Sequence, residues 1–227
     1  MAETSLFFAD LLQDLDGVEV VNYHVSNPPV FLKIQPPSSI YYMELGVGAL
    51  YLQKFNHPDV ALSLIRPGEI FGEEGLFGPR RYELAAGLLT NSTLMRVPKE
   101  AFLAKCRERP DWAMALAQLA TVRQSEWASR IESLLREAAG PRLVRTLLEL
   151  AEAFNRLRGT PADIGARIPL TQSTLANLVG VTRESASHKL NELERKGLVT
   201  LVRGVIEIPS MARLAQFNTP LPAAAQV

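Results

Sequence analysis

The sequence predicts an α+β fold: an N-terminal antiparallel β-roll, then a long helix, then a C-terminal helical module that ends in a β-hairpin. Three patterns support this prediction. Short apolar runs broken by turn residues occupy residues 18–97, a continuous helical pattern spans about 110–138, and two capped helices with a hairpin follow Ile168. With 227 residues the chain is long enough for two modest domains, each with its own core.

The N-terminal part is expected to be a jelly roll preceded by a short amphipathic helix over residues 5–16. Turn signals recur about every ten residues, which is typical of an antiparallel sandwich or roll. The expected strands lie in the runs VEVVNYHV, PVFLKI, IYYMELGVGALYLQKF, VALSLI and LLTNSTLMRV. No helix of normal length fits between these runs.

The long helix carries a heptad stripe. Pro110 suits its first turn, where a missing N–H has no helical partner. Steps of four and three residues predict a seam that pairs with a second copy, made of Ala113, Ala117, Ala120, Gln124, Trp127, Ile131 and Leu134. The alternative is a helix that packs only against its own roll, a contact expected of the neighbouring Leu116, Leu119 and Leu135. Gly140-Pro141 is expected to break the helix, and residues 142–154 begin another.

The C-terminal module has the order helix, turn, helix and wing. Thr171 and Thr182 are placed to cap two short helices, and Gly180 stands at the turn between them. The second helix has a polar face in its first two turns, and two strands joined by the turn Arg203-Gly204 follow it. This order resembles a winged helix-turn-helix DNA-binding domain, whose second helix enters the major groove. The alternative is a packing module with a solvated polar helix.

Charge is divided unevenly, although the chain is neutral overall with 24 basic and 24 acidic residues. The part before Ala138 has 13 basic and 17 acidic side chains, a net charge of −4, and the part after it has 11 and 7, a net charge of +4. A basic C-terminal module suits the phosphate backbone of DNA.

Several classes of protein are not expected. The single cysteine, Cys106, excludes an internal disulfide and a cysteine-ligated cluster, and no metal site is predicted. No leader sequence and no run of roughly 18 apolar residues is present, so we expect a cytoplasmic protein. The histidines are scattered at His24, His57 and His188, so an enzyme is not expected and no catalytic residue is predicted. A cyclic-nucleotide signalling module that uses its C-terminal domain for protein contacts is a further alternative.

The segment RPGEIFGEEGLFGPRRYELAA places Gly68, Gly72 and Gly75 around Glu69, Glu73 and Glu74. With the winged module, this cassette resembles the phosphate cassette of the Crp/Fnr family of bacterial transcription regulators, and the resemblance extends from about Val18 to Leu214. It implies a sensor roll (residues 1–109), a dimerisation helix (110–138), a DNA-binding domain (139–216) and a flexible tail (217–227). The alternative is that the glycines only permit tight turns.

The expected effector pocket departs from the cyclic-AMP pattern of the family. The Arg-Ser pair that holds the phosphate is matched by Tyr82 and Glu83, and the Thr-Ser pair that bonds the adenine by Trp127 and Ala128. Cyclic AMP is therefore not expected. The alternatives are no effector, a cyclic nucleotide whose phosphate Arg81 rescues, or a small anion such as 2-oxoglutarate held by Arg81 and Arg123. The candidate pocket comprises Gly72, Glu73, Arg80, Arg81, Tyr82, Glu83, Arg123 and Trp127.

The resemblance also implies the DNA contacts. In the family an Arg-Glu pair and a later Arg read each half-site, and here Arg183, Glu184 and His188 match these positions, with Ser187 as a further base contact. Backbone contacts are expected from Thr171, Gln172, Thr182, Ser185, Lys189 and Arg203. The family further implies a homodimer on a palindromic site in double-stranded DNA, and contact with RNA polymerase.

Overall fold

The computed structural model describes residue 12 and residues 15–32, 35–53, 59–77, 84–161 and 165–218. The chain divides into two units, Met1–Glu132 and Ser133–Val227, each with its own internal packing. The division falls inside the long helix α4, Pro110–Arg136. The four parts expected from the sequence, with limits at residues 109, 138 and 216, stay a prediction.

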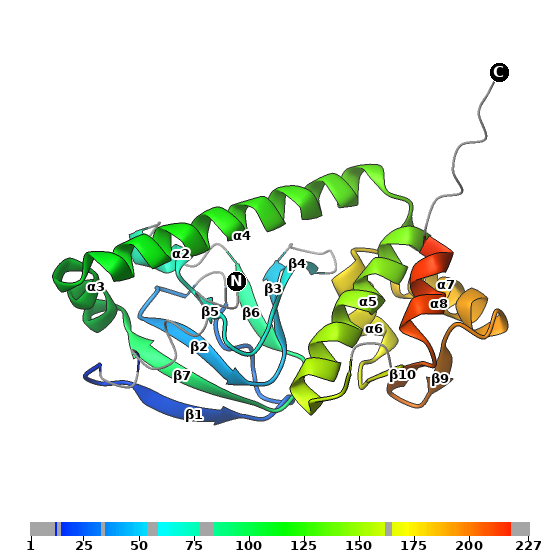
Figure 1. Cartoon of the computed structure of the whole chain (residues 1–227), viewed down its shortest axis with the longest axis horizontal. Coiled ribbons are helices and arrows are strands. Elements are labelled where there is room, and N and C mark those ends of the chain that lie inside the picture. The colour runs from blue at the N-terminus through cyan, green and yellow to red at the C-terminus, as the bar shows by residue number, and fades with distance from the viewer. Residues whose placement is uncertain are drawn as a thin grey trace, which may run out of the picture. The chain divides into compact units, whose positions relative to one another are not determined.

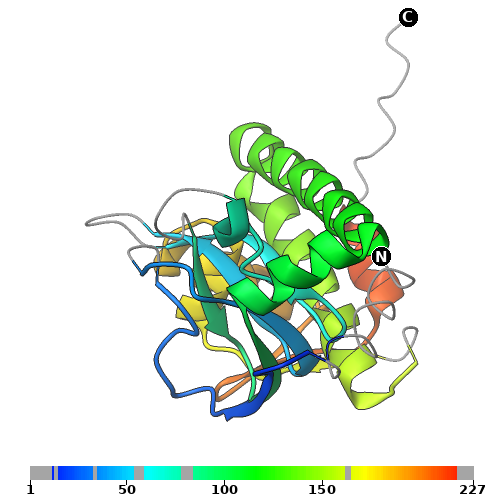
Figure 2. The ribbon, with the colours of Figure 1, turned by 90° about the vertical axis from the view of Figure 1, so that its left-hand side faces the viewer.

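The first unit is built on two antiparallel sheets. One contains, in order, β1 (Glu19–Tyr23), β7 (Ser92–Pro98), β2 (Ser39–Leu45) and β5 (Ile70–Phe71). The other contains β4 (Val60–Ile65), β3 (Gly48–Leu52) and β6 (Ala85–Leu88). The described part of α4 in this unit runs along one side of the sheets in both views (Figures 1 and 2). The predicted β-roll with a long helix is thereby confirmed.

Strand β2 is buried on both faces because it separates two apolar clusters. Ile40 and Tyr42 point to one side, where they pack with Trp112 of α4. Tyr41 and Met43 point to the other side, into the space between the two sheets. Since successive side chains of a strand alternate between faces, the continuous burial of β2 reflects a helix layer on one face and a second sheet on the other.

Two details of the first unit differ from the expectation. The run PVFLKI forms no strand within the described residues, because Phe31 makes only a single bridge with Ala86. Pro28 and Pro29 lie shortly before Phe31 and lack the N–H groups that a longer ladder of hydrogen bonds needs. Helix α3 (Lys99–Glu108) is an addition to the predicted elements. The helix expected over residues 5–16 lies outside the described residues, except for Leu12 in its helical turn and Leu15 and Asp16 at its end.

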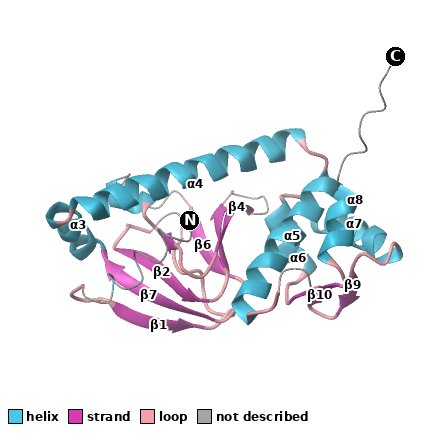
Figure 3. Cartoon of the chain, viewed as in Figure 1, coloured by secondary structure: helices cyan, strands magenta, loops and turns pink. Residues whose placement is uncertain are grey.

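The second unit is mostly helical (Figure 3). Its helices are α5 (Ala139–Arg158), α6 (Gln172–Val179), α7 (Arg183–Arg195) and α8 (Met211–Asn218). Its three strands, β8 (Ala166–Ile168), β10 (Val205–Ile208) and β9 (Thr200–Val202), form one antiparallel sheet in that order. Helix α8 was not among the predicted elements, although the hydroxyl of Ser210 accepts a hydrogen bond from the amide of Arg213 as an N-terminal cap does.

The break after the long helix falls two residues earlier than expected. Helix α4 ends at Arg136 and α5 begins at Ala139, so Gly140 and Pro141 lie in the first turn of α5. Proline is tolerated there because the first N–H groups of a helix have no helical partner. Within the part of the chain that the structure describes, no helix is both long and apolar enough to cross a membrane.

Candidate functional site

The helix-turn-helix is fixed by two threonine caps and one glycine. The hydroxyl of Thr171 accepts a hydrogen bond from the amide of Thr174 (3.1 Å), and that of Thr182 accepts one from the amide of Ser185 (3.2 Å). Gly180 ends α6 in the left-handed conformation, with φ of 77°. Residues with a Cβ rarely adopt this conformation, so glycine permits the sharp turn. The predicted caps and turn are confirmed.

Helix α7 has a buried face and an exposed one. Ala186, Leu190 and Leu193 are buried, whereas Arg183, Glu184 and His188 are exposed. Among the described residues, the side chains of Arg183, Glu184, Ser187 and His188 form no hydrogen bond or ion pair. Their polar groups are therefore available to an external partner, in the first two turns of the helix.

A groove of about 440 Å³ lies between the starts of α6 and α7 and the hairpin of β9 and β10. The hairpin turns at Arg203 and Gly204, with Val202 paired to Val205, as the sequence predicts. The groove brings together four of the residues predicted to contact DNA, namely Thr171, Gln172, Arg183 and Arg203. Two guanidinium groups that have no partner among the described residues thus border one concave surface, which suits a phosphate backbone.

The remaining predicted DNA contacts lie along α7 and outside this groove. Thr182 is exposed, and Ser185, Ser187 and Lys189 are half-buried. Lys189 Nζ donates to Glu192 Oε2 (3.2 Å), and Lys196 Nζ donates to the other oxygen of the same carboxylate (3.1 Å). Lys196 and Lys189 lower the pKa of Glu192. The charge of Lys189 is therefore partly matched within its own helix.

Arg142 is a functional candidate that the sequence analysis missed. Its guanidinium is buried and donates to the carbonyls of Val179 (2.8 Å) and Gly180 (3.5 Å) at the helix-turn-helix turn. It also donates to the carbonyls of Ser133 (3.4 Å) and Glu137 (2.9 Å), near the end of α4. One side chain thus ties the turn to the segment that precedes α5, and burial lowers its pKa. No local pattern marks this role, because Val179 is far along the chain.

In the first unit, the glutamate cassette pairs with the long helix. Gly72 has a φ of 85°, and the Glu73 side chain is only 8% exposed. Arg123 Nε lies 3.4 Å from Glu73 Oε1, an ion-pair distance without hydrogen-bond geometry. The other nitrogens of Arg123 donate to the carbonyl of Ile70 (2.9 Å) and to the hydroxyl of Ser63 (3.4 Å). Arg123 is therefore engaged within its own unit.

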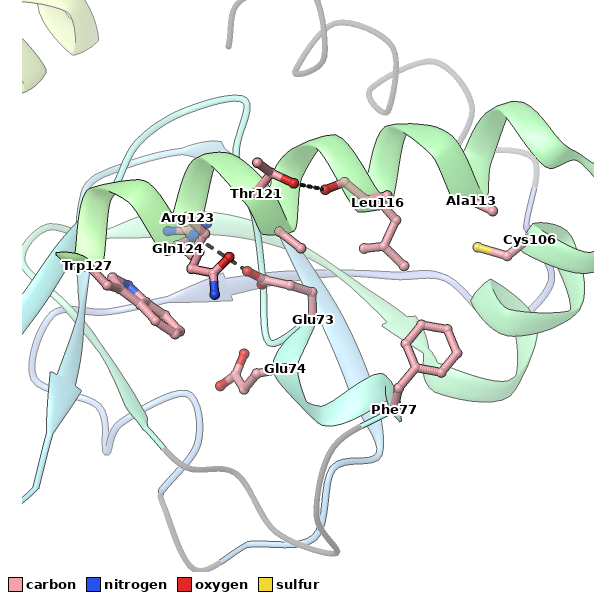
Figure 4. A pocket seen from close by; sticks show the side chains of 12 residues that line it. Glu73, Glu74, Phe77, Cys106, Ala113, Leu116, Thr121, Arg123, Gln124 and Trp127 are labelled. Atoms are coloured by element: carbon pink, nitrogen blue, oxygen red, sulfur yellow. Dashed lines mark hydrogen bonds and ion pairs between the residues drawn. The ribbon is translucent and has the colours of Figure 1, made fainter. Parts of the chain in front are cut away.

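A cavity of about 680 Å³ lies between the short helix α2 (Glu74–Phe77), α3 and α4. Figure 4 shows Glu73 and Glu74 below α4, with Trp127 at one end and Phe77 and Cys106 at the other. Burial raises the pKa of Glu73, and it raises the pKa of Glu74 to about 7, with the charge of Glu73 as the second cause. The other predicted pocket residues, Arg80, Arg81, Tyr82 and Glu83, lie outside the described residues.

The predicted seam lies on the open side of α4. Ala113, Ala117, Ala120 and Gln124 are exposed, Ile131 is 49% exposed, and Leu134 is half-buried. Trp127 differs from these residues, because its ring packs against the core between the two sheets of its own roll.

One expectation about the flank of the seam is wrong. Leu116 and Leu119 pack against the roll as expected, but Leu135 is 80% exposed. Sixteen residues at about 100° each place Leu135 roughly 160° around the helix from Leu119, so the two cannot share a buried face.

Comparisons with known proteins agree with this architecture. A model of the cyclic nucleotide-binding domain matches residues 27–109, and a model of the Crp-like helix-turn-helix domain matches residues 141–217. The transcriptional regulator SdrP of Thermus thermophilus is 30% identical over 161 residues, which cover 69% of this chain and 72% of SdrP. The chain belongs to the Crp/Fnr family. It is a DNA-binding transcription regulator and not an enzyme.

Other Crp/Fnr regulators match over most of the chain. The cyclic AMP receptor protein of Thermus thermophilus is 27% identical over 188 residues, 83% of each chain. The global nitrogen regulator of a Synechocystis strain is 26% identical over 191 residues, 82% of this chain and 83% of the regulator.

Solved structures show the same fold. A CRP/FNR family transcriptional regulator from Thermus thermophilus matches with a TM-score of 0.71 and 26% identity, over 88% of this chain and 98% of the regulator. FixK2 from Bradyrhizobium japonicum matches with a TM-score of 0.73 and 18% identity, over 90% of this chain and 99% of FixK2. A β-roll, a long helix and a winged helix-turn-helix therefore occur in this order, as predicted.

Proposed function

We propose that this Crp/Fnr regulator binds a palindromic site in double-stranded DNA as a homodimer and does not require cyclic AMP. The observation that supports the proposal most directly is the polar start of α7. Arg183, Glu184 and His188 are exposed there without a side-chain partner among the described residues, beside the groove that Arg183 shares with Arg203. A recognition helix reads bases with such side chains at its N-terminal end.

The proposed base contacts follow from the donors and acceptors of these side chains. Arg183 would donate two hydrogen bonds to guanine O6 and N7, and Glu184 would accept from cytosine N4, each contact discriminating by about 1–3 kcal/mol. His188 is shorter than the arginine of the family pattern and has fewer donors, so its base pair would be read more loosely. Ser187 is a further candidate. Thr171, Gln172, Thr182, Ser185, Lys189 and Arg203 are the proposed backbone contacts.

The proposed dimer uses the seam of α4. Ala113, Ala117 and Ala120 are exposed and small, which lets a second helix approach closely, and Ile131 adds exposed apolar surface. Trp127 is already partly covered by its own roll, so only its remaining surface is available to the partner. Contact with RNA polymerase is proposed from the family alone.

Independence from cyclic AMP is proposed because Trp127 and Ala128 stand where a Thr-Ser pair would bond the adenine. The alternative is a regulator gated by a cyclic nucleotide or by a small anion such as 2-oxoglutarate. An anion that used Arg123 would compete with Glu73 and with the carbonyl of Ile70, which already occupy the guanidinium. This competition favours the proposal over that alternative.

Two measurements on the full chain test the proposal. Sedimentation equilibrium should give a dimer at the concentrations used for DNA binding. Fluorescence anisotropy with a labelled palindromic duplex should then give the same affinity with and without saturating cyclic AMP or 2-oxoglutarate, and Arg183→Ala should abolish the preference for that duplex over a scrambled one. A gain of tenfold or more with cyclic AMP would refute the independence, and a similar gain with 2-oxoglutarate would support the alternative.

A further inference from the structure

The last turn of α7 is bonded to the hairpin that follows it. The amide of Leu201, the middle residue of β9, donates to Glu194 Oε1 (2.8 Å). The backbone carbonyl of Glu194 accepts from the amide of Gly197 (2.8 Å), in the short segment 196–199 that joins α7 to β9 (Figure 1). Glu194 therefore bonds both the turn that leaves the helix and the strand to which that turn leads.

The amide of Leu201 lies on the open edge of the sheet. The strand order is β8, β10, β9, so β9 pairs on one side only. Residues of an antiparallel pair alternate between those that bond their partner and those that turn their N–H and C=O groups outward. Leu201 stands opposite Ile206, but its amide donates to Glu194 and thus points outward. Since an edge amide has no partner within its own sheet, the carboxylate is a specific tether from the helix to this edge.

The tethered strand carries the wing side of the groove. Leu201 lines the groove of about 440 Å³ together with Arg183 and Arg203. Arg203 stands two residues beyond Leu201, at the turn of the hairpin. Glu194 is exposed and is not among the residues that line the groove. It therefore contacts the wing without occupying the surface proposed for DNA.

Glu194 and Arg183 share one face of α7. They are eleven residues apart in the same helix, and at about 100° per residue this is three turns plus about 20°. At about 1.5 Å per residue they are separated by about 16 Å along the helix axis. One face of α7 thus borders the groove at its start through Arg183 and bonds the hairpin at its end through Glu194.

We propose that Glu194 is a positioning residue for DNA binding, which holds the wing at α7 so that Arg203 reaches the phosphate backbone of the half-site that α7 reads. A hydrogen bond to a carboxylate is stronger than one to a neutral acceptor, which suits a tether at an exposed edge. The inference deepens the proposed function and rests on it, because the backbone role of Arg203 and the reading role of α7 come from that proposal.

The sign of the effect separates a tether from a simple charge. Removal of a carboxylate near DNA strengthens binding by electrostatics alone, because the carboxylate repels the phosphates. Glu194→Gln removes the charge but keeps an oxygen that can accept from the amide of Leu201, whereas Glu194→Ala removes both. The difference between these two variants therefore isolates the hydrogen bond.

Fluorescence anisotropy of the full chain with the palindromic duplex, over a range of salt concentrations, measures this difference. Glu194→Gln should bind at least as tightly as wild type. Glu194→Ala should bind more weakly than Glu194→Gln by about fivefold at about 0.15 M salt, which is the share of one phosphate contact at a log–log slope of about −0.9. The magnitude of its salt slope should be smaller by about one.

A double variant tests the coupling to Arg203. Glu194→Ala combined with Arg203→Ala should bind no more weakly than Arg203→Ala alone, because the contact that the tether serves is already lost. Glu152 supplies the matched control, since it is an exposed carboxylate of α5 with no hydrogen bond or ion pair among the described residues. Glu152→Gln and Glu152→Ala should bind DNA alike. Thermal unfolding followed by circular dichroism checks that every variant is folded at the assay temperature.

The inference is overturned if Glu194→Ala and Glu194→Gln have the same affinity and the same salt slope, or if the double variant shows both losses in full. Its failure is distinct from failure of the proposed function. Arg203→Ala in the same series weakens binding if the backbone role of Arg203 holds, whatever the Glu194 variants do. No effect of Arg203→Ala would remove that role and the role of the tether with it.

Discussion

Replacing Glu74 by glutamine should remove one part of the pH dependence of stability in the first unit, where burial also raises the pKa values of Glu69 and Glu73. Burial, and next the charge of Glu73, raise the pKa of Glu74 from 4.5 to about 7. The folded chain thus holds the proton more tightly than the unfolded chain. The stability from this carboxylic acid is therefore fully present below pH 4.5 and is lost as the pH rises toward and through 7.

The size of the effect follows from the shift. A rise from 4.5 to about 7 is 2.5 pKa units, which at 1.36 kcal/mol per unit is about 3 kcal/mol of unfolding free energy above pH 7. Glutamine has no charge to desolvate, so the variant should lack this loss. It should match wild type near about pH 4.5 and exceed it by about 3 kcal/mol near pH 8.

Urea unfolding followed by tryptophan fluorescence reports this unit alone, because the chain has two tryptophans, Trp112 and Trp127, and both lie in it. Glu100→Gln, a variant that removes an exposed carboxylate of α3, should follow wild type at every pH. The reasoning is refuted if Glu74→Gln is less stable than wild type at pH 8, or if its unfolding free energy changes with pH as that of wild type does. Either result would show that Glu74 is ionised and satisfied in the fold.

Three further variants test other parts of the account. Arg203→Ala should weaken binding to all DNA sequences alike, and anisotropy should show that the magnitude of the slope of log affinity against log salt falls by about one. Lys189→Ala should have a smaller effect, because Glu192 already partly matches that charge. A change in sequence preference would instead place the side chain on a base. Arg142→Leu should destabilise the second unit by about 3 kcal/mol, because it leaves several buried carbonyls without a donor. Thermal unfolding followed by circular dichroism measures this loss, and an unchanged midpoint would contradict the linking role of Arg142. Ala120→Glu should shift sedimentation from dimer to monomer, while Ser125→Glu, at an exposed position about 140° around the helix, should not. A dimer in both variants would move the interface off the seam.

The helix-turn-helix could be predicted because its signals are local. Thr171 and Thr182 cap the residues three positions later, and Gly180 acts through its own backbone conformation. The hairpin turn at Arg203 is equally local, since the paired residues Val202 and Val205 are three apart. Each of these elements needs only its own sequence neighbours, so the pattern contains the information.

Features that depend on distant contacts could not be predicted in the same way. Arg142 looks like an ordinary helical residue, and its partner Val179 is 37 positions away. The burial of Glu74 depends on α4 packing beside α2, although α4 begins more than 30 residues later in the chain. The apolar character of Leu135 and its place beside the seam favour an inner position, but its angular position on the helix places it outside. Apolar character alone does not determine which way a helical residue points.

Selection of binding sites from random double-stranded DNA, with the full chain and no cyclic AMP, tests the central claim most directly. The account predicts a palindrome with guanine and cytosine in each half, read by Arg183 and Glu184, and a looser position opposite His188. Arg183→Ala, carried through the same selection, should relax the guanine while leaving the two-fold symmetry intact. The claim is contradicted if the selection recovers an unsymmetrical site or no common site. It is also contradicted if a palindrome is recovered only when cyclic AMP is added.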